Sequence, residues 1–231
     1  MQMQAELVQG TPEWFSARLG KITSSNVGLL IGKGKGSEFT TTAMSYLFEV
    51  ASERGLREDY TIGDGFEEYL KRTSISNKAM AYGTEHEAVA RKIYSMQNEN
   101  YNIVEVGFIN AGFASGTEEI EGYGDSPDGV AYENESTEGV LEIKCPNPAT
   151  FLKYKYLFSI GQTLKEIEPK YYWQCVSHIY CNGVQWCDFI YFDKMMKDGF
   201  NVVRIERNEA DINLLLSRIK TANQLINSLL K

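Results

Sequence analysis

The spacing of hydrophobic and polar residues changes repeatedly along this chain of 231 residues, and each change predicts a new element. Apolar residues three and four apart predict helices over 12–19, 24–31, 40–54, 76–97, 169–182 and 209–230. Runs rich in β-branched and aromatic residues predict strands over 101–111, 112–119, 184–193 and 200–207. Because no repeat or low-complexity tract separates these elements, we expect one mixed α/β domain over residues 1–231.

Capping residues and apolar faces define the helices further. Thr11 is a good N-cap for the first helix, Ser24 or Ser25 can cap the second, and Gly183 is suited to end the helix over 169–182. The expected buried face of the helix over 40–54 consists of Met44, Leu47, Phe48 and Ala51. The expected buried face of the last helix consists of Ile212, Leu215, Leu216, Ile219, Ala222 and Ile226.

The segment from 124 to 146 predicts a hairpin that gathers charged side chains. Its second strand carries Glu142 and Lys144, which point to one face because side chains alternate along a strand. Asp128 comes just before the first strand, so the hairpin would bring it beside Glu142. Two carboxylates and an ammonium on one face are costly unless a cation neutralises the acids. Mg²⁺ suits this role because it takes oxygen ligands and keeps waters for chemistry.

A surface hairpin with a Lys–Glu ion pair is the alternative, and spacing alone favours it. Two local features favour a site instead. Leu141 and Ile143, which flank Glu142, have the character of core residues, and Asp128 lies in a rigid Ser-Pro-Asp-Gly turn. The three charged residues match the Asp…Glu-x-Lys core of the PD-(D/E)xK nucleases, a short pattern that the rest of the chain has to support.

Two basic segments near the start of the chain are candidates for binding phosphate. Arg18 lies before a predicted helix start that carries Ser25, and free backbone N–H groups at a helix start favour an anion. Ordinary capping explains the same residues equally well. Lys33 and Lys35 lie in the loop GKGKGSEF, which lacks the spacing of a P-loop and suits either a DNA backbone or solvent.

Two predicted helices carry further candidates. Glu87 is either a third acid at the metal site or the partner of Arg91 in an ordinary i,i+4 ion pair, which is the more common arrangement. Tyr171, Gln174 and His178 share one helix face, where Tyr and Gln can hydrogen-bond a water or a phosphate oxygen. For His178 a buried, hydrogen-bonded core position is the favoured interpretation.

Composition limits the class of protein. The net charge of −8 argues against a protein that coats DNA nonspecifically, although it permits an enzyme with a local basic groove. The four cysteines have no zinc-like spacing, which favours free thiols in a reducing compartment. No run reaches the length of a membrane span and no signal pattern opens the sequence, so we expect a cytoplasmic protein with no membrane partner.

Several motifs in fixed order resemble the bacteriophage lambda exonuclease (YqaJ-like) family: WFSARLGKITSSNV, AMAYGTEHEAVAR, GDSPDGV, LEIKCP, YYWQCVSHIY and VVRIER. The resemblance runs from about Thr11 to the last helix. It implies a central twisted mixed sheet flanked by helices, with a restriction-endonuclease-like PD-(D/E)xK core. The implied activity is a metal-dependent 5′→3′ exonuclease that degrades one strand of duplex DNA and leaves 3′ single-stranded tails for recombination.

The resemblance also implies roles for the residues of the hairpin. Asp128 and Glu142 would ligate Mg²⁺ together with the backbone carbonyl of Ile143, and Glu87 would hold a second ion. Mn²⁺ is an expected substitute. Lys144 would position the attacking water and stabilise developing charge.

Further implied roles concern DNA and partners. Gln174 and Tyr171 belong to the helix beside the site in that family, and Arg18 and Ser25 match positions expected to hold a 5′-phosphate. The family implies a ring-shaped homotrimer that threads duplex DNA ends, and a single-strand annealing protein as partner. One departure is that the family has an arginine after the helix that carries the two serines, whereas here only Lys33 and Lys35 are nearby, which weakens the expected 5′-phosphate preference.

Two alternatives remain open at this stage. One is a PD-(D/E)xK nuclease of other polarity or with endonucleolytic action. The other is a DNA-binding or partner-docking protein that keeps the fold without cleaving, although Asp128, Glu142, Lys144 and Glu87 are all present.

Overall fold

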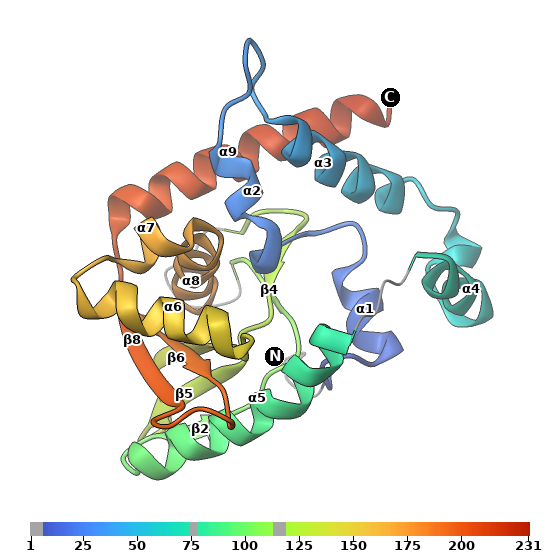
Figure 1. The fold of residues 1–231 in the computed structure, drawn as a ribbon. Helices are drawn as coiled ribbons and strands as arrows, with labels where there is room; N and C mark the ends of the chain where they lie inside the picture. Colours follow the sequence, from blue (N-terminus) through green and yellow to red (C-terminus); the bar gives the residue numbers. More distant parts are fainter. Residues whose placement is uncertain (1–6, 74–77, 113–118) are drawn as a thin grey trace.

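The computed structural model describes residues 7–73, 78–112 and 119–231 (Figure 1). The first half of the chain forms α1 (Pro12–Arg18), β1 (Ile22–Thr23), η2 (Ser24–Asn26), α2 (Gly28–Ile31), α3 (Thr41–Arg54), η3 (Glu58–Tyr60), α4 (Gly63–Thr73) and α5 (Lys78–Gln97). Next come the strands β2 (Asn102–Val104), β3 (Ile109–Asn110), β4 (Tyr123–Asp125), β5 (Gly129–Glu133) and β6 (Ser136–Lys144). They are followed by the helices α6 (Pro148–Ser159), α7 (Leu164–Ile167) and α8 (Pro169–Asn182), and then by strand β7 (Trp186–Phe192). The chain closes with β8 (Phe200–Glu206) and α9 (Glu209–Leu229).

A mixed five-stranded sheet in the order β2-β5-β6-β7-β8 confirms the predicted fold class. β5 and β6 form the predicted antiparallel hairpin, in which Gly129 lies opposite Leu141. The other edge of β6 pairs with β7 in parallel, so β6 lies in the middle of the sheet. The surface-hairpin alternative is therefore wrong, because β6 has a strand on both sides and its Leu141 and Ile143 are fully buried.

Both faces of β6 are covered. Leu141 and Ile143 pack with Ala90 and Tyr94 of α5 in one hydrophobic cluster. Val140, on the opposite face, belongs to a second cluster that includes α3, α8 and α9. Figure 1 shows α5 along one side of the sheet and α6 and α8 on the other. Glu142, which shares the face of Val140, is consequently enclosed between the sheet and α8.

A second sheet of three short strands was not predicted. Its order is β1-β4-β3, with β1 parallel and β3 antiparallel to β4. The predicted strand over 101–111 is in fact divided between β2 and β3, one in each sheet. Most of the strand predicted over 112–119 lies outside the described residues. The small sheet matters for the site because β4 ends at Asp125, beside α8.

The helix ends partly follow the predictions. Thr11 caps α1 by accepting the N–H of Trp14, and Gly183 ends α8 with a φ of 66°. The predicted helix over 24–31 is wrong as a single element, because η2 and α2 divide it and neither serine caps it. The buried Ser24 side chain instead hydrogen-bonds the hydroxyl of Ser177, at 2.6 Å, and so is not available to cap a helix.

The predicted faces of α3 and α9 are also partly right. Phe48 is 53% exposed, so its predicted burial is wrong; the face of α3 that is buried against its neighbours consists of Ala43, Tyr46, Leu47, Val50 and Ala51. On α9 the predicted residues are buried except Leu216, which is half-buried, and the face also includes Arg218. Arg218 is tolerated there because its guanidinium donates to the carbonyls of Leu30 and Glu38.

Candidate active site

The β5–β6 hairpin brings Asp128, Glu142 and Lys144 together, as the sequence predicts. Asp128 is tied to β6 at two points: its N–H donates to the Leu141 carbonyl at 3.0 Å, and its Oδ2 accepts the N–H of Ile143 at 2.6 Å. Glu142 is only 1% exposed, and its Oε1 contacts the ammonium of Lys144. The predicted ligand role of the Ile143 carbonyl stays a prediction, but this peptide lies directly beside the Asp128 carboxyl group.

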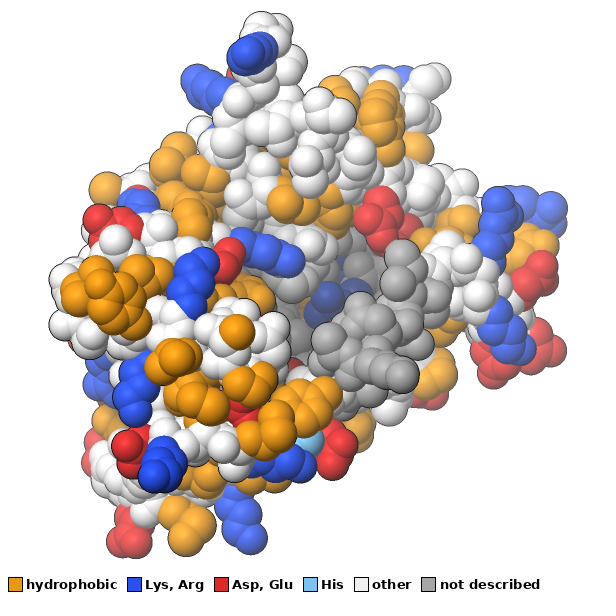
Figure 2. All heavy atoms as spheres, viewed as in Figure 1, with side chains coloured by type: hydrophobic (Ala, Val, Ile, Leu, Met, Phe, Trp, Pro, Cys, Tyr) orange, Lys and Arg blue, Asp and Glu red, His pale blue; other side chains and the backbone are white. Residues whose placement is uncertain are grey.

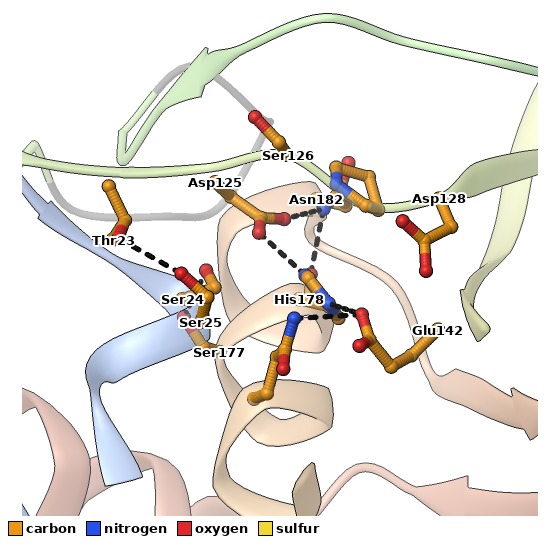
Figure 3. A network of polar contacts seen from close by, with 12 residues as sticks. Thr23, Ser24, Ser25, Asp125, Ser126, Asp128, Glu142, Ser177, His178 and Asn182 are labelled. Carbon is orange, nitrogen blue, oxygen red and sulfur yellow. Dashed lines mark hydrogen bonds and ion pairs between the residues drawn. The ribbon is translucent and has the colours of Figure 1, made fainter. Parts of the chain in front are cut away.

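Helix α8 supplies a second set of contacts to Glu142. Gln174 Nε2 and His178 Nε2 lie 2.9 and 2.7 Å from the same oxygen, Oε2 of Glu142 (Figure 3). The ring of Tyr171 lies 5.2 Å from the Lys144 ammonium. The predicted shared face of Tyr171, Gln174 and His178 therefore points to the site. His178 is fully buried and hydrogen-bonded, which confirms that interpretation, but it also contacts the central glutamate.

Glu87 approaches from α5 on the other side of the charged group. Burial raises its pKa, the Lys144 ammonium opposes that shift, and the charge of Glu142 adds to it. The i,i+4 ion pair with Arg91 is wrong, because Arg91 instead binds the Glu105 carboxylate at 2.7 Å and the Asp128 carbonyl at 2.6 Å. Arg91 thus fixes the turn before β5 and leaves Glu87 to interact with the site.

The pKa values of Asp128, Glu142 and Lys144 are shifted because two acids and a lysine are buried close to one another. Burial, and then the charge of Glu142, raise the pKa of Asp128 to about 8. Burial alone would raise the pKa of Glu142, but the Lys144 ammonium and the His178 hydrogen bond hold it below its ordinary value. Burial alone would lower the pKa of Lys144, but Glu142 and Asp128 raise it. Lys144 is therefore charged at neutral pH, while Asp128 retains a proton until the pH approaches 8.

The oxygen atoms present fit a hard divalent cation. Oε1 of Glu142 is buried, and the Lys144 ammonium is its one polar partner among the described residues. Within the described part of the chain, no three acidic, histidine or cysteine side chains converge closely enough to hold a metal alone. Asp128 and Glu142 would supply two ligands, and water, backbone carbonyl or DNA oxygens the rest, which suits Mg²⁺.

Arg18 lies beside the turn that carries Asp128. Its guanidinium donates to the hydroxyl of Ser126 at 3.3 Å and stacks over Trp14 at 4.0 Å. The sequence analysis did not name Ser126 as a site residue, although its position two residues before Asp128 could have indicated that it lies near the site. Ser25 lies in the neighbouring segment, where its hydroxyl is 3.2 Å from that of Thr23, and Figure 3 shows Thr23 and Ser25 on the side of the network opposite Glu142.

Lys33 and Lys35 are not brought to these residues. Both are exposed in the loop between α2 and α3, which projects from the body of the molecule in Figure 1 and carries basic side chains at its tip in Figure 2. Neither lysine forms a hydrogen bond or ion pair with a described site residue.

Asp125, which is buried, is another site residue that the sequence analysis missed. It is fully buried at the end of β4, where its carboxylate contacts His178 Nδ1 at 2.5 Å and accepts the Asn182 amide at 2.7 Å. A carboxylate buried in a strand, such as Asp125 beside Tyr123, needs a hydrogen-bond partner, but the sequence gives no indication that this partner is on α8.

Comparisons with known proteins agree with this fold. Residues 13–185 match the YqaJ-like viral recombinase domain. The crystal structure of the alkaline exonuclease LHK-Exo from Laribacter hongkongensis is similar, with a TM-score of 0.73 and 30% identity over 95% of this chain and 94% of that one. The structure of LHK-Exo in complex with dAMP gives the same values. A search of curated protein sequences gave no significant match.

A more distant structure, a phage-related exonuclease from Haemophilus somnus 129PT, has a TM-score of 0.58 and 17% identity over 90% of this chain and 94% of that one, which shows the fold alone. The chain belongs to the YqaJ-like viral recombinase domain family, as the motifs indicated. No helix among the described residues is both long and apolar enough to cross a membrane.

Proposed function

We propose that this protein is a Mg²⁺-dependent exonuclease that degrades one strand of duplex DNA from a 5′ end. The observation that carries the proposal is the placement of Asp128, Glu142 and Lys144 on the central hairpin, with Gln174 of α8 bound to Glu142, in a chain of this family. The relative LHK-Exo is named an alkaline exonuclease, and one of its structures holds dAMP, a deoxynucleoside monophosphate. A 5′-mononucleotide is the product expected of phosphodiester hydrolysis here.

The metal-binding part of the proposal assigns Asp128, Glu142 and the Ile143 carbonyl to one ion and Glu87 to a second, with Mn²⁺ as a substitute. Bound divalent ions neutralise charge on the attacking and leaving oxygens of a phosphodiester. An alkaline optimum would agree with a pKa of about 8 for Asp128, because the carboxyl group must lose its proton to bind a cation.

The remaining chemistry comes from the side chains. Lys144 keeps its charge in alkaline solution because Glu142 and Asp128 raise its pKa, so it can stabilise charge that develops at the scissile phosphate. Gln174 holds Glu142 in place, and Tyr171 covers Lys144.

The 5′ end is proposed to bind at Arg18, with hydroxyls from Ser25 and Ser126. Arg18 already donates to Ser126, and it lies beside the turn that carries Asp128. Burial lowers the pKa of Arg18, and the charges of Tyr46, Asp125 and Glu53 oppose that shift. Because Lys33 and Lys35 are in an exposed loop, we propose that they contribute little to the preference for a 5′-phosphate.

The assembly and partners follow from the family resemblance. We propose a single nuclease domain over residues 1–231 that forms a ring-shaped homotrimer around DNA and passes the 3′ tail to a single-strand annealing protein. An exposed apolar stripe on α6 and its end supports self-association: Leu152, Tyr156 and Ile160 are 57%, 61% and 55% exposed. Figure 2 shows apolar side chains gathered over this part of the surface.

The test is cleavage of a linear duplex labelled separately at its 5′ and 3′ ends, with Mg²⁺ and with EDTA. We expect Mg²⁺-dependent release of 5′-end nucleotides, which Lys144→Ala abolishes and Lys153→Ala, at an exposed site on α6, retains. Release from the 3′ end, or cleavage of closed circular DNA, would support a PD-(D/E)xK nuclease of other polarity or mode. Binding without cleavage in every lane would support the non-enzyme alternative.

A further inference from the structure

A buried line of charged groups passes from the small sheet to the proposed metal site. Asp125, His178 and Glu142 are 0%, 0% and 1% exposed, and His178 lies between the two carboxylates (Figure 3). Its Nδ1 is 2.5 Å from Asp125 Oδ1 and its Nε2 is 2.7 Å from Glu142 Oε2. Two carboxylates can both accept from one imidazole only when each ring nitrogen carries a hydrogen.

The contacts to Glu142 distinguish its two oxygens. Oε2 is occupied by two donors of α8, Gln174 and His178, whereas the one polar partner of Oε1 in the described residues is the Lys144 ammonium. A glutamate held in this way presents Oε1 to the site. Loss of the His178 contact would leave Gln174 as the remaining donor to Oε2 and free the carboxylate to rotate.

His178 is itself held by the small sheet. The Asn182 amide donates to Asp125 Oδ2 at 2.7 Å and to the His178 carbonyl at 2.8 Å, so it ties the end of β4 to α8. Ser177, the preceding residue of α8, hydrogen-bonds Tyr123 of β4 and Ser24 of η2. The position of His178 is therefore fixed by contacts outside the proposed active site.

We propose that His178 is a positioning residue, braced by Asp125, that orients Glu142 so that Oε1 alone is available to a divalent cation. This inference rests on the proposed function and deepens it. Partners that orient a metal ligand typically change metal affinity by about 10–100-fold when they are removed. A histidine that only filled the core would affect stability without affecting metal affinity.

The test measures binding of MnCl₂ to the whole protein without DNA, by calorimetry, together with thermal unfolding. We expect His178→Gln, which can donate to only one of the two carboxylates at a time, to raise the Kd for Mn²⁺ by about 10–100-fold. Asp125→Asn should raise it in the same direction, although Asp125 does not touch the proposed ligand oxygens. The matched control is Val176→Ala, which removes buried apolar contacts of the same helix and should lower stability while leaving the Kd unchanged.

Unchanged Mn²⁺ affinity in a folded His178→Gln protein would overturn the inference. If that variant does not fold, unchanged affinity in Asp125→Asn would overturn it equally. Both results would leave the proposed function intact, because the wild-type protein would still bind the ion. Failure of the wild-type protein to bind Mn²⁺ would instead overturn the proposed function and this inference with it.

Discussion

Replacing Lys144 by methionine would separate its electrostatic role in the metal-free protein from its proposed role in catalysis. Methionine keeps an unbranched side chain of similar length and removes the charge. In the metal-free protein the Lys144 ammonium contacts Glu142 Oε1 and lowers the pKa of Asp128 and Glu142. The variant leaves these acids without that cation, whereas a bound Mg²⁺ would replace its charge.

The size of the effect follows from burial. Removing one partner of a buried ion pair typically costs about 3–5 kcal/mol. Because the Lys144 side chain is 26% exposed, water screens part of its charge, and the lower end, about 3 kcal/mol, is appropriate. At about 2–4 °C per kcal/mol for a chain of this size, the metal-free Tm should fall by about 6–12 °C. Cleavage should fall by at least about 100-fold through loss of the positive charge at the phosphate.

Thermal unfolding with EDTA and with Mg²⁺ tests this reasoning. We expect Mg²⁺ to raise the Tm of Lys144→Met by more than it raises that of the wild type, because the ammonium no longer competes with the ion for Glu142 and Asp128. Lys153→Met, at an exposed position, controls for loss of a lysine charge and should behave as wild type. An equal metal-free Tm and an equal Mg²⁺ response in Lys144→Met and the wild type would refute the argument.

Further predictions concern protonation, reactivity and packing. Because the folded-state pKa of Asp128 is raised from its ordinary 3.8 to about 8, the metal-free protein should lose stability as the pH rises through this interval. Over the same interval, Mg²⁺ binding should tighten as the pH approaches 8 and should release protons. Calorimetry in buffers of different ionisation enthalpy measures that release. A Mg²⁺ affinity that does not change with pH would contradict the prediction. Burial and then the charges of Glu87 and Asp128 raise the pKa of the Cys145 thiol to about 12. A Mg²⁺ ion bound to these acids would offset their charge and favour the thiolate, so Mg²⁺ should speed the alkylation of Cys145 by iodoacetamide, measured by mass spectrometry. A Cβ at Gly139 would lie 2.3 Å from the indole of Trp186, so Gly139→Ala should cost about 1–3 kcal/mol in urea unfolding; an unchanged midpoint would show that the indole moves aside.

The parts of the structure that the sequence predicted are those with a local signal. Alternation around Glu142 and the turn at Asp128 were enough to place the hairpin, and Pro169 and Gly183 were enough to place the ends of α8. Once these elements were placed, the side chains that share a face could be predicted from the repeat of a strand or a helix alone. This is why Asp128, Glu142 and Lys144 could be assigned to one site.

The missed parts depend on contacts between distant segments. β1 and β4 contain two and three residues and pair across about a hundred positions of sequence, so neither has a periodicity to detect. Asp125 and His178 are separated by 53 positions, and neither residue type indicates its partner. The exposure of Phe48 could not be foreseen because the direction from which α9 packs on α3 decides it.

The central place of β6 has a consequence for how the protein loses activity. Amide groups on a strand with partners on both edges and packed side chains on both faces exchange with solvent only when the whole structure opens. Residues 139–141 of β6 pair with β5 on one edge and β7 on the other, so their N–H groups should be among the slowest to exchange with deuterium. Since Glu142 and Lys144 follow directly on the same strand, partial unfolding at the periphery would leave the charged groups in register, and inactivation in denaturant should coincide with global unfolding.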